Sequence, residues 1–233
     1  GQDHLALYLH NGNEYLEGML GAYKARVAPF NVNYRYVAEE LHYLLDDAGA
    51  AGVVYHSAFA PVLDAVRPML PRLRVLLQVA DDSGIGLLEG AEWYEDALGA
   101  ESTSIDDDLV SSWSPDDLYI LYTGGTTGMP KGVMWRQHDI FIGAMGGRPF
   151  GQPDAFESIE AIVESSANGG AAMMSAAPLM HGAAQWATFT AFTSGNTVVF
   201  PEHITRLDPA DIWSTVERHR VLTLQIVGDA PGL

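Results

Sequence analysis

Short apolar runs alternate with longer amphipathic segments over the first 80 residues, and this alternation restricts the fold more than any other feature of the chain. Residues 5–9, 27–32, 53–55 and 75–79 are short and apolar, which is typical of buried strands. Residues 37–48 repeat leucines at helical spacing before a glycine, which predicts a helix that ends there. A strand–helix–strand order implies parallel strands joined by right-handed crossovers. The sequence therefore predicts an α/β fold with mostly parallel strands.

The second half of the chain continues this pattern with longer irregular stretches. Residues 171–192 are long enough to span a bilayer, which needs roughly 20 apolar residues. Pro178 and several polar residues interrupt them, so we expect a buried strand, loop and helix and no transmembrane segment. Asp208 and Pro209 predict the start of a helix that runs to about His219. Residues 146–170 are rich in glycine and proline and predict a long, poorly ordered loop.

Charge and cysteine content exclude several classes of function. The chain has 30 acidic and 12 basic residues and a formal charge of -18, which argues against binding to nucleic acid and to anionic lipid. There are no cysteines, which excludes a disulfide, a thiolate metal site and a cysteine nucleophile. The aspartate runs at residues 81–82, 106–108 and 116–117 lack the spacing of a calcium loop and are expected in solvated loops. No secretory leader opens the sequence, so we expect a cytoplasmic protein.

One glycine-rich stretch between two apolar runs carries the chain's candidate chemistry. Residues 123–132 read Thr-Gly-Gly-Thr-Thr-Gly-Met-Pro-Lys-Gly. The threonines offer hydroxyl donors, the glycines let backbone N–H groups turn inward, and the lysine adds one positive charge. A plain glycine-rich turn is the alternative, but a tight hairpin does not need ten such residues. The candidate polyphosphate ligands are Thr123, Gly124, Gly125, Thr126, Thr127, Gly128 and Lys131.

This stretch differs from the common nucleotide-binding loop. The pattern G-x-x-x-x-G-K-[ST] needs glycine before the lysine and a hydroxyl after it, whereas Pro130 and Gly132 flank Lys131. Residues 133–135 are apolar and strand-like, so no helix opens on the phosphates. We therefore expect a hydroxyl loop between two strands, without a helix dipole.

The same residues resemble the phosphate-binding signature of the adenylate-forming enzymes, which include acyl-CoA synthetases, luciferases and peptide-synthetase adenylation domains. The usual signature has serine at or beside Gly125, so this loop has one hydroxyl donor fewer. Residues 178–182, Pro-Leu-Met-His-Gly, resemble the family's proline–leucine–x–histidine motif, whose histidine lies near the acyl site. Residues 23–45 resemble an earlier segment of the same enzymes. The sequences of these segments are most similar to those of bacterial, particularly actinobacterial, fatty-acid–CoA ligases of the long-chain or steroid-acid type.

The resemblance implies a fold, a reaction and a set of ligands. The fold would be a layered sandwich of mostly parallel sheets flanked by helices, forming a partial N-terminal ATP- and acyl-binding domain over residues 1–233. Its sub-regions would cover about 1–80 and 116–233, with a linker over about 81–115. The reaction would use ATP with Mg²⁺ to convert a carboxylic acid to an acyl-adenylate and then transfer the acyl group to CoA.

A histidine and a set of three aromatic residues could each be core packing instead of part of a site. A lone histidine in an apolar stretch is commonly a hydrogen-bonded core residue, but the resemblance places His181 at the acyl site as a gating or lining group. Trp186, Phe189 and Phe192 recur near helical spacing, which favours core packing over an acyl-pocket wall.

Several parts of the family's machinery have no counterpart in the sequence. We find no adenine loop, no glutamate motif for Mg²⁺, no ribose aspartate and no C-terminal adenylation lysine, and Asp229 is not interpreted as the ribose ligand. The chain is therefore predicted to be a fragment that is inactive alone. Two alternatives stay open: an acyl-AMP ligase or adenylation domain that loads a carrier protein, and a non-catalytic nucleotide-binding module.

Overall fold

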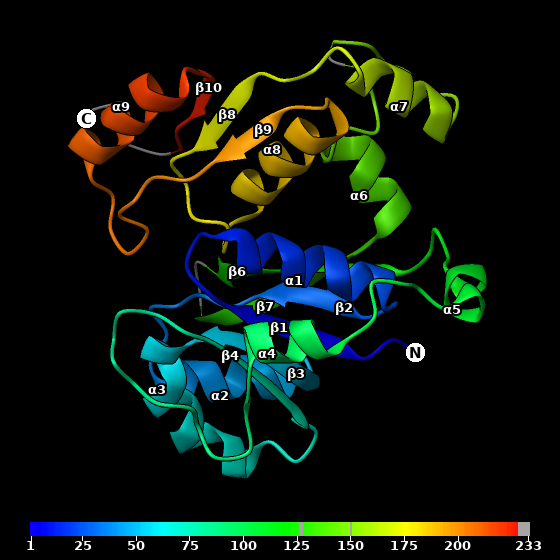
Figure 1. Ribbon diagram of the computed structural model, residues 1–233. Coiled ribbons are helices and arrows are strands. Elements are labelled where there is room, and N and C mark those ends of the chain that lie inside the picture. Colours follow the sequence, from blue (N-terminus) through cyan, green and yellow to red (C-terminus); the bar gives the residue numbers. More distant parts are fainter. Residues whose placement is uncertain (126–127, 150, 228–233) are drawn as a thin grey trace. The chain divides into compact units, whose positions relative to one another are not determined.

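A computed structural model describes residues 1–125, 128–149 and 151–227, and these residues form two β-sheets (Figure 1). The chain divides into two compact units, Gly1–Arg136 and Gln137–Leu233. One sheet lies in each unit. The mixed α/β fold with mostly parallel strands is confirmed, whereas the sub-regions and linker expected from the sequence stay a prediction.

The sheet of the first unit has the strand order β5-β4-β3-β1-β2-β6-β7. All neighbouring strands are parallel except β6 and β7, which form an antiparallel pair. The strands are β1 (His4–Tyr8), β2 (Ala28–Asn31), β3 (Ala50–His56), β4 (Val75–Val79), β5 (Glu92–Trp93), β6 (Leu118–Gly125) and β7 (Gly128–Arg136). Every residue of β3 is buried, as expected for a central strand covered on both faces.

Helices cover both faces of this sheet (Figure 1). Because side chains alternate along a strand, Leu7 and Val54 point toward Gly18 of one helix, while their neighbours join the core under other helices. The helical segments are α1 (Asn13–Lys24), α2 (Ala38–Asp47), η1 (Ser57–Phe59), α3 (Ala60–Val66), η2 (Arg67–Met69), α4 (Tyr94–Ala100) and α5 (Asp107–Ser112). The leucines of α2 are buried, and Gly49, with φ +60°, follows the end of the helix. The helix predicted over residues 37–48 is confirmed.

One expectation for the acidic runs is wrong. Asp117 is buried, and its carboxylate accepts hydrogen bonds from Arg26 Nε at 3.0 and 3.1 Å. Its main-chain neighbour Ser114 also donates its N–H to Asp117. The carboxylate of Asp117 is therefore held by an ion pair with a residue 91 positions earlier in the chain.

The sheet of the second unit has three parallel strands in the order β10-β8-β9. Its elements are α6 (Gln137–Ala144), α7 (Ile159–Ser166), β8 (Ala172–Ser175), α8 (Gly182–Thr193), β9 (Thr197–Val199), α9 (Pro209–His219) and β10 (Val221–Gln225). Residues 171–192 form a strand, a loop and a helix, as predicted. None of the helices in the described part of the chain is long and apolar enough to cross a membrane.

Local capping explains one success and one error in this unit. Asp208 accepts hydrogen bonds from the N–H groups of Ala210 and Asp211, so α9 starts where the sequence predicted. In contrast, α7 lies within the stretch expected to be a poorly ordered loop. The hydroxyl of Ser158 accepts from the N–H of Ala161 and caps this helix, a signal that the surrounding glycines and prolines obscured.

Candidate functional site

The candidate phosphate ligands lie on the antiparallel hairpin formed by β6 and β7, here called the β6–β7 hairpin. The register pairs Thr123 with Lys131 and Gly125 with Gly128. Directly opposed residues in such a pair lie roughly 4.5–5.5 Å apart, so a hydroxyl and an ammonium group come from adjacent backbone positions. Thr126 and Thr127 lie outside the described residues. The predicted arrangement, two strands without a helix opening on the loop, is confirmed.

The hairpin emerges from the core immediately before the candidate ligands. Ile120, Leu121 and Tyr122 are buried, whereas Thr123 is exposed. Lys131 is also exposed and makes no ion pair within the part of the chain that the structure describes. A lysine held beside a hydroxyl at the end of a paired strand can contact a phosphate without first breaking a salt bridge.

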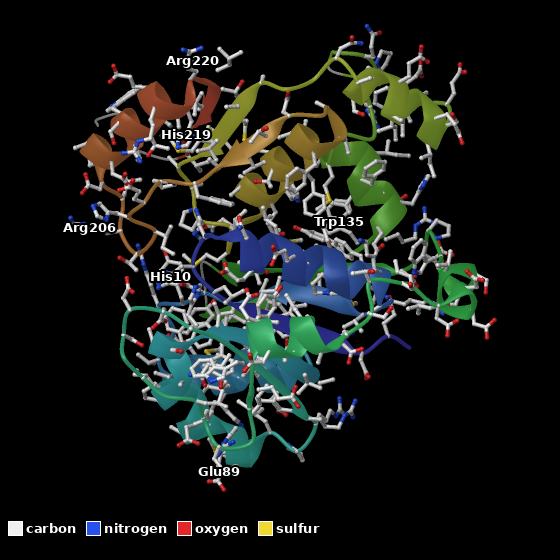
Figure 2. All side chains as sticks on the ribbon, viewed as in Figure 1. His10, Glu89, Trp135, Arg206, His219 and Arg220 are labelled. Carbon is white, nitrogen blue, oxygen red and sulfur yellow. The ribbon has the colours of Figure 1, made fainter. Side chains whose placement is uncertain are left out.

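Gly128 supports the same geometry. Its φ is +154°, a value that side-chain-bearing residues rarely adopt. The remaining length of β7 carries Trp135, which is labelled in Figure 2 and is 42% exposed. β7 is the edge strand of the sheet. Its first residue, Gly128, has a backbone conformation that favours glycine.

His181 lies in the second unit, at the residue before α8 begins. Its backbone N–H donates to the carbonyl of Pro178 at 3.0 Å, which closes a tight turn between β8 and the helix. Leu179 and Met180 are buried, and Gln185 Nε2 donates to Leu179 O at 2.8 Å. His181 itself is exposed, so the alternative of a core histidine is wrong. Buried residues thus anchor the turn of the motif, whereas the histidine is exposed to solvent.

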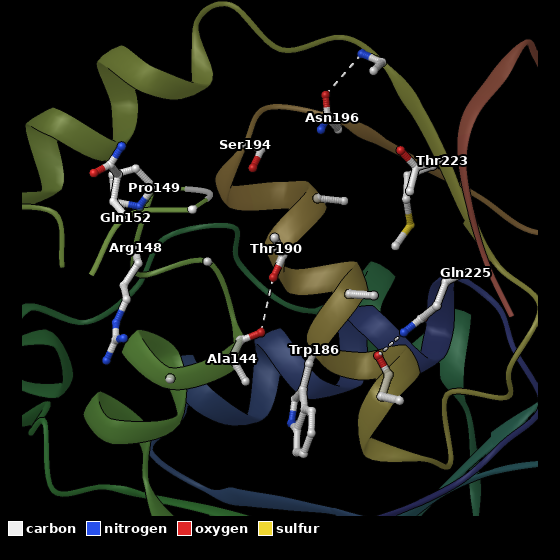
Figure 3. Close-up of a pocket in the computed structure, with 18 of the residues that line it drawn as sticks. Ala144, Arg148, Pro149, Gln152, Trp186, Thr190, Ser194, Asn196, Thr223 and Gln225 are labelled. Carbon is white, nitrogen blue, oxygen red and sulfur yellow. Dashed lines mark hydrogen bonds between the residues drawn. The ribbon is translucent and has the colours of Figure 1, made fainter. Parts of the chain in front are cut away.

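A pocket of about 720 Å³ lies entirely within the second unit. Figure 3 shows Trp186 and Thr190 of α8 beside it, with Arg148 from the segment after α6 and Gln225 from β10. Its volume is within the range of roughly 300–1,000 Å³ that small-molecule sites occupy. The other residues that line it include Ala144, Ala172, Met173, Ala183, Ala187, Ala191, Asn196 and Thr223.

Small residues on α8 create the space, and hydrogen bonds hold its wall. Ala183, Ala187 and Ala191 recur at four-residue intervals and line the pocket, so they share one helix face. Thr190 Oγ1 donates to Ala144 O at 3.2 Å, and Gln225 Nε2 donates to Ala183 O at 3.1 Å. Core packing, expected for three aromatic residues of α8, is confirmed for Phe189, which is buried. It is wrong for Phe192, which is exposed, and for Trp186, which is half-buried at the pocket. The regular alanine spacing is the sequence signal that could have found this face.

A third cluster was missed by the sequence analysis. It gathers beyond the carboxyl ends of the parallel strands of the first unit, where ligands commonly bind in such sheets. His10, labelled in Figure 2, lies 4.5 Å from Tyr34, 4.9 Å from Phe59 and 5.5 Å from His56 between ring centroids. Burial, reinforced by the neighbouring His56, lowers the pKa of His10 to about 4, and Asp81 only partly opposes this.

Burial favours the neutral form of both histidines in this cluster. Burial also lowers the pKa of His56, and the backbone N–H of His10 donates to His56 Nδ1 at 3.2 Å. Within the described residues, no group of three or more histidine, aspartate or glutamate side chains is arranged to hold a metal ion.

Comparison with known proteins identifies the family and agrees with the fold. The model of the AMP-binding enzyme family matches residues 1–230. The medium-chain acyl-CoA ligase Mig of Mycobacterium avium is 56% identical over 231 residues, which are 99% of this chain and 42% of Mig. A medium/long-chain-fatty-acid–CoA/3-oxocholest-4-en-26-oate–CoA ligase of Mycolicibacterium smegmatis is 36% identical over 98% of this chain and 41% of its own length. The chain thus spans about two fifths of these relatives.

A solved structure extends the likeness to the fold. The inhibitor-bound N-terminal domain of FACL13 from Mycobacterium tuberculosis matches 96% of this chain and 49% of that domain, with a TM-score of 0.72 and 22% identity. At this identity the likeness concerns the arrangement of helices and strands.

Proposed function

Because the chain belongs to the family of AMP-binding enzymes, we propose that it is the ATP- and acyl-binding part of a CoA ligase for fatty acids or steroid acids. The observation that carries the proposal is the pairing of Thr123 with Lys131 across the β6–β7 hairpin. It gives the family's phosphate signature a defined backbone frame. The chain covers about two fifths of its relatives, so the activity belongs to the longer protein.

The first step joins the carboxylate of the acid to the α-phosphate of ATP and releases pyrophosphate. Lys131 and Thr123 hold the β- and γ-phosphates and stabilise the departing pyrophosphate, with Thr126 and Thr127 as further ligands outside the described residues. No covalent intermediate with the protein is needed, so positioning and charge neutralisation supply the catalysis.

The second step transfers the acyl group from the adenylate to the thiol of CoA and releases AMP. Because the chain has no cysteine, the thiol comes from outside it. Mg²⁺ that accompanies ATP and a cytoplasmic location stay predictions.

The pocket of the second unit is the proposed site for the acyl group. Its alanine-lined helix face and Trp186 offer an apolar wall, which suits a hydrocarbon chain or a steroid ring system. His181 ends the turn two residues before Ala183, which lines the pocket. The names of the relatives, which include medium-chain, long-chain and steroid acids, favour an apolar carboxylic acid as substrate.

A lysine exchange in the full-length protein tests the proposal. Lys131→Ala removes a charged hydrogen-bond donor worth about 1.5–3 kcal/mol, so we expect KM for ATP to rise about 10- to 100-fold in acyl-adenylate formation, followed by hydroxamate trapping. The chain's other lysine, Lys24, is exposed in the last turn of α1, and Lys24→Ala is the matched control. Equal KM values for both variants would refute the phosphate assignment. Trapping without CoA consumption would point to a carrier-protein acceptor.

A further inference from the structure

A side chain of β2, that of Asn31, joins the β6–β7 hairpin to the sheet just beyond the last backbone pair of β2 and β6. The register of β2 and β6 pairs Phe30 with Ile120. One residue further along β2, Asn31 takes over with its side-chain amide. Its Nδ2 donates to Tyr122 O at 2.8 Å, and its Oδ1 accepts from Tyr122 N at 2.7 Å. The side chain thereby satisfies both main-chain groups of Tyr122 and replaces a rung of the sheet.

This bridge is buried and therefore strong. Asn31 is 5% exposed and Tyr122 is 8% exposed. A buried main-chain group that loses its partner bears a desolvation cost. The two hydrogen bonds to the Asn31 amide therefore fix the main chain of Tyr122 relative to β2.

The ring of Tyr122 ties the second strand of the hairpin to the same point. Tyr122 lies opposite Gly132 in the register. A Cβ added at Gly132 would lie 2.9 Å from Tyr122 Cζ, so the ring covers the backbone of β7. Its hydroxyl donates to Asp47 Oδ2 at the end of α2, at 2.7 Å. Burial, together with the hydrogen bond to Asp47, raises the pKa of Tyr122 well above its ordinary value, and the hydroxyl stays a donor.

The next residue on each strand is a candidate phosphate ligand. Thr123 follows Tyr122, and Lys131 precedes Gly132. The contacts that anchor Tyr122 and Gly132 thus lie one residue from the exposed pair of Thr123 and Lys131. A misplacement of about 1 Å at a binding group can cost up to about 100-fold in rate, so the stiffness of this point bears directly on phosphate binding.

We propose that Asn31 and Tyr122 are positioning residues for the phosphate site: their buried contacts hold the base of the β6–β7 hairpin so that Thr123 and Lys131 meet the polyphosphate of ATP together. The inference rests on the proposed function. It concerns residues that touch no substrate and act through the hairpin backbone.

Kinetics of the full-length protein separate positioning from general stability. We expect Asn31→Ala to raise KM for ATP about tenfold while KM for the carboxylic acid changes by less than about twofold. The matched control is Gln78→Ala. Gln78 is a fully buried amide of β4 that bonds Ser57 Oγ and Gly86 O, both at 2.9 Å. It lies four strands from β6 in the same sheet, about 19 Å at ~4.8 Å per strand.

A tyrosine pair gives a second, milder measurement. Tyr122→Phe keeps the ring and removes the bond to Asp47, and we expect KM for ATP to rise about threefold. Its control is Tyr55→Phe, which removes a buried hydroxyl bonded to Gln78 Oε1 at 2.9 Å. This pair decides the question if Asn31→Ala does not fold.

The outcomes are distinguishable from failure of the proposed function. If KM for ATP in Asn31→Ala or Tyr122→Phe equals that of its control while Lys131→Ala impairs ATP use, the positioning role is wrong and the phosphate site stands. If Lys131→Ala has no effect, the proposed function itself fails. A selective rise in KM for ATP, at matched losses of thermal stability, supports the positioning role.

Discussion

Replacement of Gly132 by alanine perturbs the base of the hairpin at one atom. The added Cβ would lie 2.9 Å from Tyr122 Cζ, 3.0 Å from Cε2 and 3.2 Å from the hydroxyl oxygen. A ring can often swing away from such a contact. This ring is 8% exposed, lies 5.7 Å from the ring of Phe30 between centroids and is hydrogen-bonded to Asp47. It can move only by losing those contacts.

The magnitude follows from that restraint. Overpacking of a filled site costs about 1–3 kcal/mol, and loss of a hydrogen bond to a charged acceptor costs a similar amount. For a chain of this size each kcal/mol lowers Tm by about 2–4 °C. We therefore expect Gly132→Ala to lower Tm of the first unit by about 2–12 °C in scanning calorimetry.

A second glycine of the same hairpin is the control. Gly124 has no atom within 4 Å of an added Cβ and has no positive φ. Gly124→Ala should change the free energy of unfolding by less than about 1 kcal/mol. A Gly132→Ala variant as stable as Gly124→Ala would refute the reasoning. The double variant Gly132→Ala with Tyr122→Ala should be less destabilised than the sum of its parts, because the clash partner is absent.

Two further results are expected. Ala187→Phe fills the pocket of the second unit and should lower kcat/KM for the longest accepted acid at least about tenfold, while the shortest changes less than about threefold; equal losses for both acids would argue against an acyl site there. Burial lowers the pKa of His10 from 6.5 to about 4, so the unfolded chain binds more protons than the folded chain between these pH values. The free energy of unfolding therefore falls as pH decreases through that window, by on the order of 1 kcal/mol for a partly exposed ring. Urea unfolding between pH 7 and 4 measures this, and His10→Gln should flatten the dependence; an unchanged slope would exclude His10 as its source.

Much of the fold was predictable because its signals are local. The leucine spacing of α2, the cap at Asp208 and the apolar run of β4 each involve residues within one or two turns of one another. The order of strands and helices then fixes parallel pairing. The hydroxyl loop between two strands was predictable for the same reason, since β6 and β7 are neighbours in sequence.

Errors arose where a distant residue decided the outcome. Asp117 was expected in solvent because it belongs to an acidic pair, but its buried carboxylate pairs with Arg26. Trp186 was expected in the core because it has helical spacing, but the alanines around it leave a pocket. Composition cannot report either, because both depend on which elements pack together.

The sequence by itself determined the order of the elements and the identity of the phosphate-binding stretch, because periodicity, caps and glycine patterns act over a few residues. Tertiary structure decided what holds that stretch in place. Asn31 and Tyr122 are 91 residues apart and meet only because β2 and β6 are neighbours in the sheet. The same packing places the ring of Tyr122 against the backbone of Gly132, where a side chain would clash with it.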